Sequence, residues 1–184
     1  DGFAWWKARF GKMSEYFDAY RIDHVLGFFR IWQIPTDAIH GLLGVFHPAL
    51  PFSPEQLRAD FDFWINPDVQ ARPLILEWML TDFFGNSTGE VKEKYLSHIG
   101  GDRYELRDFV STQKKVAEYF GSMPASEENT RICEGLLGLI DNVLFIEDPY
   151  EKGKYHPRIA AQFTHQYRCL SDYERWCFDR LYND

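Results

Sequence analysis

The stretch RIDHVLGFFRIW, residues 21–32, places an arginine and an aspartate two positions apart in a largely apolar run. In AYRIDHVL (residues 19–26) the side chains alternate with a period of two, which predicts a short β-strand. Side chains two positions apart on a strand point the same way. We therefore expect Arg21 and Asp23 to be neighbours on one face, with Asp23 nearer the strand's C-terminal end.

This pairing has a chemical consequence. An arginine beside an aspartate fixes the carboxylate by charge-assisted hydrogen bonds and lowers its pKa. Such an aspartate stays ionised at neutral pH, as a nucleophile must. The same two residues could instead form a structural ion pair at a strand end, and the spacing alone leaves both interpretations open.

The residues before this strand predict a helix. In DGFAWWKARFGKMSEYF (residues 1–17) apolar side chains recur at helical spacing, so we expect the helix to run from about Phe3; these side chains are Trp6, Phe10, Met13 and Phe17. A helix that leads into a short apolar strand is typical of one step of a larger α/β sheet. One parallel strand cannot form a sheet alone, so this strand needs neighbours.

The rest of the chain predicts a mainly α fold with few short strands. Glycines and prolines interrupt residues 27–52, which indicates a long loop with one helical turn near Thr36–Leu43. Ser53 with Gln56, and Ser171 with Glu174, have the spacing of helix-capping boxes. Further helices are expected over residues 72–86, 90–95, 111–122 and 126–141, and strands over residues 103–109 and 142–148.

Composition limits the partners. The net charge is −8, from 20 basic and 28 acidic side chains, and the basic residues form no run. This argues against nucleic acid and against an anionic membrane surface. No apolar stretch reaches the roughly 18 residues of a membrane span. The three cysteines and the histidines lack metal-ligand spacing, so we expect no metal. An odd number of cysteines in a chain of this length indicates reduced thiols in a cytoplasmic protein.

Aromatic side chains make up 17% of the chain: sixteen Phe, ten Tyr and six Trp. Most of them suit a packed core, because large aromatic side chains dominate core burial. A carbohydrate site is the other interpretation, since sugar rings stack their C–H faces on flat aromatic rings.

A specific order of motifs runs through the first part of the chain: Trp5, Trp6 and Arg9, then Arg21-Ile22-Asp23-His24, Gly27-Phe28, Trp32 and Pro35. It resembles the 4-α-glucanotransferases, the family of amylomaltases and plant-type disproportionating enzymes. The resemblance spans essentially the whole chain and is closest in residues 3–52. It implies part of an incomplete (β/α)8 TIM barrel with a mostly helical insertion. Residues 1–45 would hold a barrel helix, the fourth strand and the active-site loop, residues 46–168 the insertion, and residues 169–184 a truncated helix returning to the barrel.

The resemblance also implies a reaction and its residues. Family enzymes cut an α-1,4-glucan bond with retention and transfer the glucanosyl unit to another sugar, without a cofactor. On this basis Asp23 is the nucleophile and Arg21 orients and ionises it. His24 would bind a sugar hydroxyl, or else face the barrel wall. Phe28 and Trp32 would stack on sugar rings, although core packing is an alternative for Phe28. The expected partners are α-1,4-glucan oligosaccharides.

One required element departs from the family pattern. The acid/base glutamate belongs to a Glu-Asp-Leu-Gly motif, which is absent; in FIEDPY the pair Glu147-Asp148 is followed by Pro149. We therefore expect this chain to be a segment that is inactive in isolation and that self-associates through uncovered apolar surface. The competing hypothesis is a non-catalytic, mostly helical module that binds carbohydrate or protein, in which Arg21 and Asp23 are structural.

Overall fold

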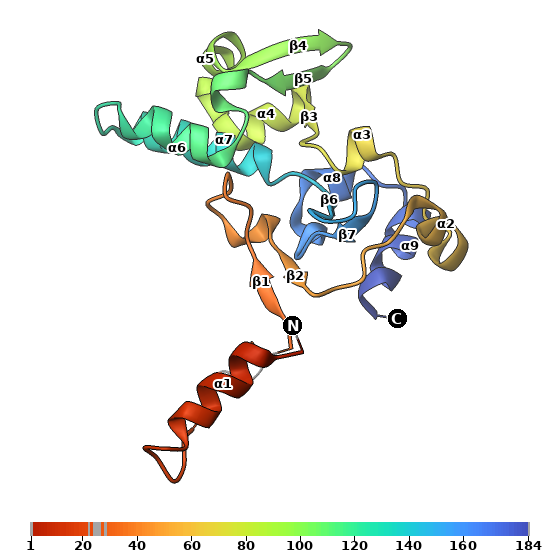
Figure 1. Ribbon diagram of the computed structural model, residues 1–184. Helices are drawn as coiled ribbons and strands as arrows, with labels where there is room; N and C mark the ends of the chain where they lie inside the picture. The colour runs from red at the N-terminus through yellow and green to blue at the C-terminus, as the bar shows by residue number, and fades with distance from the viewer. Residues whose placement is uncertain (1, 22, 24–26, 28, 184) are drawn as a thin grey trace. The chain divides into compact units, whose positions relative to one another are not determined.

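The structure, a computed structural model, describes residues 2–21, 23, 27 and 29–183. The chain divides into two compact units, Asp1–Ile31 and Trp32–Asp184. About half of it is helical, with a few short strands between the helices (Figure 1). The predicted class, mainly α with few short strands, is confirmed. The TIM barrel stays a prediction.

The smaller unit contains helix α1 (Ala4–Met13). On α1 only Trp6, Phe10 and Met13 are half-buried, which is the stripe that the sequence predicts. The ring of Phe10 stacks on Trp6 (5.5 Å between centroids) and on Tyr20 (5.2 Å). The helix ends before Phe17, which is exposed.

The strand predicted over residues 19–26 is wrong where it can be judged. Residues 19–21 have no regular structure and Asp23 lies in a bend, while residues 22 and 24–26 lie outside the described residues. None of the described strand pairs includes this segment. An alternating pattern becomes a strand only where another strand pairs with it, and within the described residues it finds none.

A short strand pair and one helical turn form the predicted loop. Strand β1 (Ile31–Gln33) pairs with β2 (Val45–His47), and the 3₁₀ turn η2 (Gly41–Leu43) lies between them. The helical turn is confirmed. The strand pair was missed because strands of three residues are too short to show periodicity.

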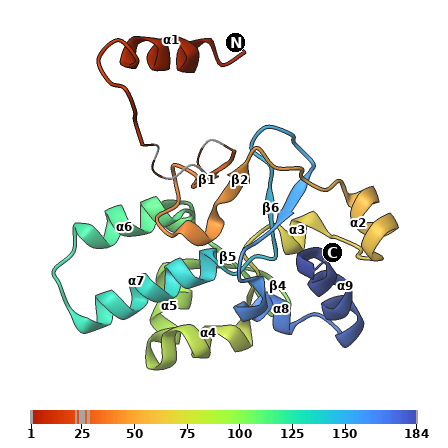
Figure 2. The same ribbon diagram turned by 90° about the horizontal axis from the view of Figure 1, so that it is seen from below.

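Four helices form the first core of the larger unit. Helix α7 packs against α4 and α6, and α5 packs against α4, as both views show (Figures 1 and 2). A Cβ at Gly135 of α7 would lie 2.7 Å from Cδ1 of Phe84, so the α4–α7 contact depends on a glycine. The helices are α4 (Glu77–Phe84), α5 (Thr88–Lys94), α6 (Gln113–Gly121) and α7 (Glu127–Ile140).

A three-stranded antiparallel sheet borders this core. Strand β5 (Arg103–Leu106) lies between β3 (Ile75–Leu76) and β4 (Leu96–Gly100). The predicted strand at residues 103–109 is confirmed over its first half. The helix predicted from residue 72 begins only at Glu77, because Ile75 and Leu76 pair with β5 instead.

The second core gathers around strands β6 (Phe145–Glu147) and β7 (Tyr155–Pro157), which pair antiparallel. Leu57, Phe145 and Phe178 are fully buried there. Both predicted capping boxes are confirmed: Ser53 with Gln56, and Ser171 with Glu174. The helices around this core are α2 (Pro54–Phe61), α3 (Pro67–Gln70), α8 (His165–Arg168) and α9 (Asp172–Asn183).

Candidate functional site

Arg21 and Asp23 form an ion pair, with Arg21 Nε 2.9 Å from Asp23 Oδ1. The predicted contact is therefore present, although residues 19–21 and 23, the described part of the segment, do not form the strand that was expected to produce it. The two side chains are 89% and 81% exposed. An ion pair open to water stabilises little, so this contact contributes little to the stability of the fold.

Of the predicted substrate-binding residues, His24 and Phe28 lie outside the described residues. Trp32 is described and half-buried in β1. Its Nε1–H donates a hydrogen bond to the carbonyl of Gly41 (2.9 Å), and the ring of Phe46 meets it edge-on at 4.8 Å. Because the indole N–H is already bonded, the contribution that Trp32 can make to a sugar is its ring face.

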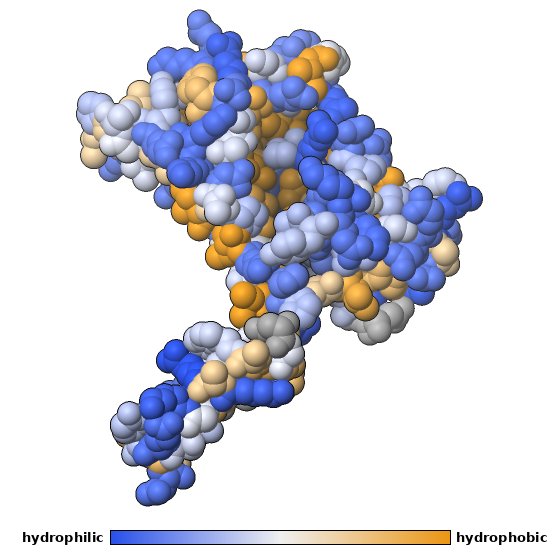
Figure 3. Space-filling model, viewed as in Figure 1, coloured by the Kyte–Doolittle hydropathy of each residue, from blue (hydrophilic) through white to orange (hydrophobic). Residues whose placement is uncertain are grey.

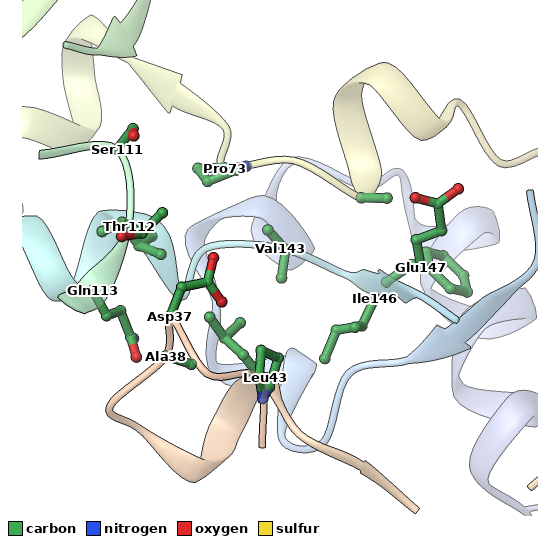
Figure 4. Close-up of a pocket in the computed structure, with 14 residues that line it drawn as sticks. Asp37, Ala38, Leu43, Pro73, Ser111, Thr112, Gln113, Val143, Ile146 and Glu147 are labelled. Atoms are coloured by element: carbon green, nitrogen blue, oxygen red, sulfur yellow. The ribbon is translucent and has the colours of Figure 1, made fainter. Parts of the chain in front are cut away.

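The larger unit contains a pocket of about 230 Å³ (Figure 4). Figure 3 shows hydrophobic residues in a hollow between α7 and α3. In Figure 4 the carboxylate of Asp37 points into the pocket and Glu147 lies on its far side. The apolar walls come from the loop after β1, from the segment between α3 and β3, from the end of α7 with the residues that follow it, and from β6; they include Pro35, Leu43, Pro73, Ile140, Val143 and Ile146.

A buried hydrogen-bond network holds the loop that carries Asp37. The side-chain oxygen of Gln113, which is fully buried, accepts hydrogen bonds from the backbone N–H groups of Ile39 (2.6 Å) and His40 (2.8 Å). Its amide group donates to Asp141 Oδ1 (2.8 Å), and Asp141 Oδ2 lies 2.6 Å from His40 Nδ1. The loop is thus tied to α6 and to the end of α7, which fixes one wall of the pocket.

The carboxylate of Asp148, part of the Glu147-Asp148 pair noted in the sequence, is hydrogen-bonded within the protein. Its Oδ2 lies 2.7 Å from His156 Nε2, and its Oδ1 accepts the backbone N–H groups of Tyr150 and Glu151. Burial raises the pKa of Asp148, but these hydrogen bonds outweigh it, so the pKa lies below its ordinary value. The carboxylate is committed to a turn between β6 and β7.

Sequence reasoning did not single out Asp37 or the polar network behind it. The available signal was a polar residue in a loop rich in glycine and proline, which is too common to identify a site. Within the described part of the chain, no group of three or more His, Cys, Asp and Glu side chains could hold a metal ion. Nor do the helices there include one long and apolar enough to cross a membrane.

The class of protein follows from comparison with known families. A family profile described as 4-alpha-glucanotransferase, glycoside hydrolase family 77, matches residues 1–168. The chain therefore belongs to this family, as its Arg-Ile-Asp-His motif predicts.

Among individual proteins, the 4-alpha-glucanotransferase DPE2 of Oryza sativa subsp. japonica is 36% identical over 190 aligned residues; the match covers 100% of this chain and 20% of that protein. The chloroplastic/amyloplastic 4-alpha-glucanotransferase of Solanum tuberosum is 41% identical over 44 residues, 24% of this chain and 8% of its own length. The Chlamydia pneumoniae enzyme is 44% identical over 32 residues, 17% of this chain and 6% of its own. The chain thus spans about a fifth of the rice protein. No solved structure matches it.

Proposed function

We propose that this chain is a segment of a retaining 4-α-glucanotransferase that transfers glucanosyl units between α-1,4-glucans. Membership of the family supports the substrate class. The observation that carries the site is the 2.9 Å contact between Arg21 Nε and Asp23 Oδ1 within the Arg-Ile-Asp-His motif. The same proposal includes the TIM barrel and a cytoplasmic setting in maltodextrin metabolism. It also includes the division of the chain into residues 1–45, 46–168 and 169–184.

In this proposal a carboxylate oxygen of Asp23 attacks the anomeric carbon of the donor glucan. The glycosidic C–O bond breaks, and an acid carboxyl group gives its proton to the departing oxygen. An acceptor hydroxyl then attacks the glucosyl–aspartate ester, loses its proton to the same carboxyl group, and releases Asp23. Arg21 holds Asp23 ionised and oriented for the first step. His24, Phe28 and the ring face of Trp32 bind the sugars.

This chemistry requires two carboxyl groups about 5–5.5 Å apart. The Glu-Asp-Leu-Gly motif that carries the acid/base residue in the family is not in this sequence. We therefore propose that the isolated chain does not turn over glucan, and that it self-associates. Turnover of maltotriose by the isolated chain, abolished by Asp23→Asn, would contradict the first statement; a monomer by light scattering at high concentration would contradict the second.

The test of the function uses a hybrid in which this chain replaces the matching segment of the rice protein. We expect the hybrid to redistribute maltodextrin chain lengths, and Asp23→Asn to reduce transfer to background. Asp18→Asn, which neutralises an exposed carboxylate five positions away, is the matched control and should leave transfer intact. Full activity of the Asp23→Asn hybrid would rule out Asp23 as the nucleophile.

The second candidate is a non-catalytic, mostly helical module that binds carbohydrate or protein. The pocket around Asp37 in the larger unit favours it, because this pocket is complete without Arg21 or Asp23. Titration of the isolated chain with maltotriose separates the two functions. Binding that Asp37→Asn weakens and Asp23→Asn leaves unchanged would support the module.

A further inference from the structure

A buried arginine stands out in the larger unit. Arg158 follows β7 and is only 3% exposed. Its backbone is held on both sides: the N–H donates to the carbonyl of Leu144 (2.8 Å), and the hydroxyl of Tyr182 donates to the carbonyl of Arg158. The backbone of Arg158 is therefore tied to Leu144 and to Tyr182.

The guanidinium group is incompletely satisfied. Nη1 donates to the carbonyl of Ile159 (3.0 Å), whereas Nε, which is buried, has no hydrogen-bond partner among the described residues. Among the described residues, Arg158 takes part in no ion pair. A buried cation without a bonded anion is costly, because it loses hydration and gains little in return.

The carboxylate that attracts Arg158, Asp141, is already hydrogen-bonded within the protein. Burial lowers the pKa of Arg158, and attraction by Asp141 acts in the opposite direction. Asp141 is bonded through Oδ1 to Gln113 and through Oδ2 to His40. It therefore favours the charged form of Arg158 from a distance without completing its hydrogen bonds. Arginine stays cationic even when buried, so the charge persists.

Arg158 lines a cavity of about 370 Å³. The apolar part of the lining consists of Leu42, Phe83, Gly138, Ala160 and Phe163, and the polar part of Asp141, Asn142, Arg158, Thr164 and His165. Phe163 is 76% exposed. A volume of this size accommodates a ring-sized ligand.

The polar groups other than Arg158 are bonded within the protein. Asn142 donates from Nδ2 to the carbonyl of Leu74 (2.6 Å) and accepts through Oδ1 from the N–H of Gln166 (2.8 Å). Thr164 donates to the carbonyl of Ala161 (2.7 Å). His165 Nε2 lies 3.1 Å from Asp82 Oδ2. Among the side chains that line the cavity, Arg158 is therefore the one with a buried polar atom that lacks a hydrogen-bond partner.

We propose that this cavity binds an oxyanion, a carboxylate or phosphate group, with the guanidinium of Arg158 as its donor. The planar fork of arginine matches both groups and makes stronger hydrogen bonds to them than to neutral acceptors. The apolar walls would cover a ring or short chain that carries the anion, with Phe163 at its outer side. The site contains neither Asp23 nor Arg21, so it does not depend on the transfer reaction.

The experiment titrates the full chain, labelled with ¹⁵N, with three probes: sodium benzoate, inorganic phosphate, and benzyl alcohol as the neutral counterpart of benzoate. The reporter is the side-chain Nε–H resonance of Arg158, assigned through bonds from its backbone. We expect benzoate or phosphate to shift this resonance saturably and benzyl alcohol to leave it in place. A shift with benzoate alone would identify a carboxylate site, and a shift with phosphate alone would identify a phosphate site.

Variants separate the cavity from nonspecific binding. Arg158→Gln should weaken binding of the active probe at least ~10-fold, as expected when a hydrogen bond to a charged group is lost. Arg168→Gln, at an exposed arginine, is the matched control and should bind like the wild type. Phe163→Ala, on the exposed rim, should weaken benzoate more than phosphate.

Because Arg158→Gln replaces a buried residue, its fold is checked by circular dichroism. If it unfolds, the wild-type titration and the Phe163→Ala variant still decide the proposal. An Arg158 resonance that neither anion shifts in the folded wild type would overturn it, as would equal affinity of the folded Arg158→Gln variant. Equal shifts with benzyl alcohol would mean that the cavity recognises apolar rings rather than oxyanions.

Discussion

Gly44→Ala tests how the position of Trp32 is fixed. A Cβ added to Gly44 would lie 2.6 Å from Cε2 of Trp32 and 2.9 Å from the carbonyl oxygen of Gln33. The φ and ψ of Gly44, −77° and 165°, are extended values that alanine adopts without strain, so the effect is steric alone. Contacts between nonbonded carbons are optimal at about 3.5–4.0 Å, so the indole must move by roughly 1 Å.

This movement breaks the hydrogen bond from Trp32 Nε1 to Gly41. Loss of such a bond costs about 0.5–1.5 kcal/mol, and overpacking costs about 1–3 kcal/mol. We expect the variant to lose ~1–3 kcal/mol of unfolding free energy in urea. The indole N–H resonance of Trp32 should move towards the solvent-exposed value. If Trp32 binds sugar through its ring face, glucan transfer by the rice hybrid should weaken in parallel.

Gly41→Ala is the matched control. Its Cβ would lie 3.7 Å from the same Trp32 Nε1 and 3.7 Å from Ile34 Cδ1, which are ordinary contacts. Its unfolding free energy should stay within about 0.5 kcal/mol of the wild type. A Gly44→Ala variant with unchanged stability and an unchanged Trp32 resonance would refute the steric argument.

Two further substitutions test the cores of the larger unit. Gly135→Ala should lower the unfolding free energy by about 1–2 kcal/mol, because overpacking against the neighbouring ring outweighs the gain in helix propensity of about 1 kcal/mol. Gly89→Ala, on a helix with open space around it, should leave stability unchanged or raise it by up to about 1 kcal/mol. If Gly135→Ala proved more stable in urea than Gly89→Ala, the close contact between Gly135 and the Phe84 ring would be contradicted. The lowered pKa of Asp148 means that its stabilising contribution is present above the unfolded-state pKa, about 3.9, and is lost as pH falls through the folded-state value. The stability difference between wild type and Asp148→Asn should therefore shrink as pH falls below about 4. A difference that stays constant from pH 6 to pH 3 would show that the pKa of Asp148 is not lowered in the fold.

The sequence predicted elements whose signals are local. Ser53 and Ser171 each precede a Gln or Glu by three residues, and the capping boxes form as expected because all their atoms belong to one helix turn. The long helix at 126–141 was equally clear, since its apolar face persists over several turns. Strand β4 (Leu96–Gly100) was missed because only its first residue is buried, so its sequence LSHIG lacks an alternating apolar face.

The cavities could not be predicted, because residues far apart in the sequence build them. The pocket around Asp37 joins the loop after β1 to Val143 and Glu147, and Gln113 fixes that loop from a third segment. Arg158 looks like an ordinary surface cation in the sequence, yet it is only 3% exposed in the fold. No spacing rule relates such positions, since each depends on how the helices close around β6 and β7.

The ion pair of Arg21 and Asp23 was predicted correctly, but an ion pair alone does not make a catalytic site. Two residues two positions apart can touch in a bend as well as on a strand, so the contact is present although residues 19–21 and 23 are not in a strand. A glucosyl–enzyme intermediate is passed to a sugar only where water is excluded, and Asp23 is 81% exposed. It must also face a second carboxyl group at about 5–5.5 Å. Exclusion of water and a facing carboxyl group both require further residues around Arg21 and Asp23. The hybrid with the rice protein is designed to supply them, so it tests Asp23 as a nucleophile where the isolated chain cannot.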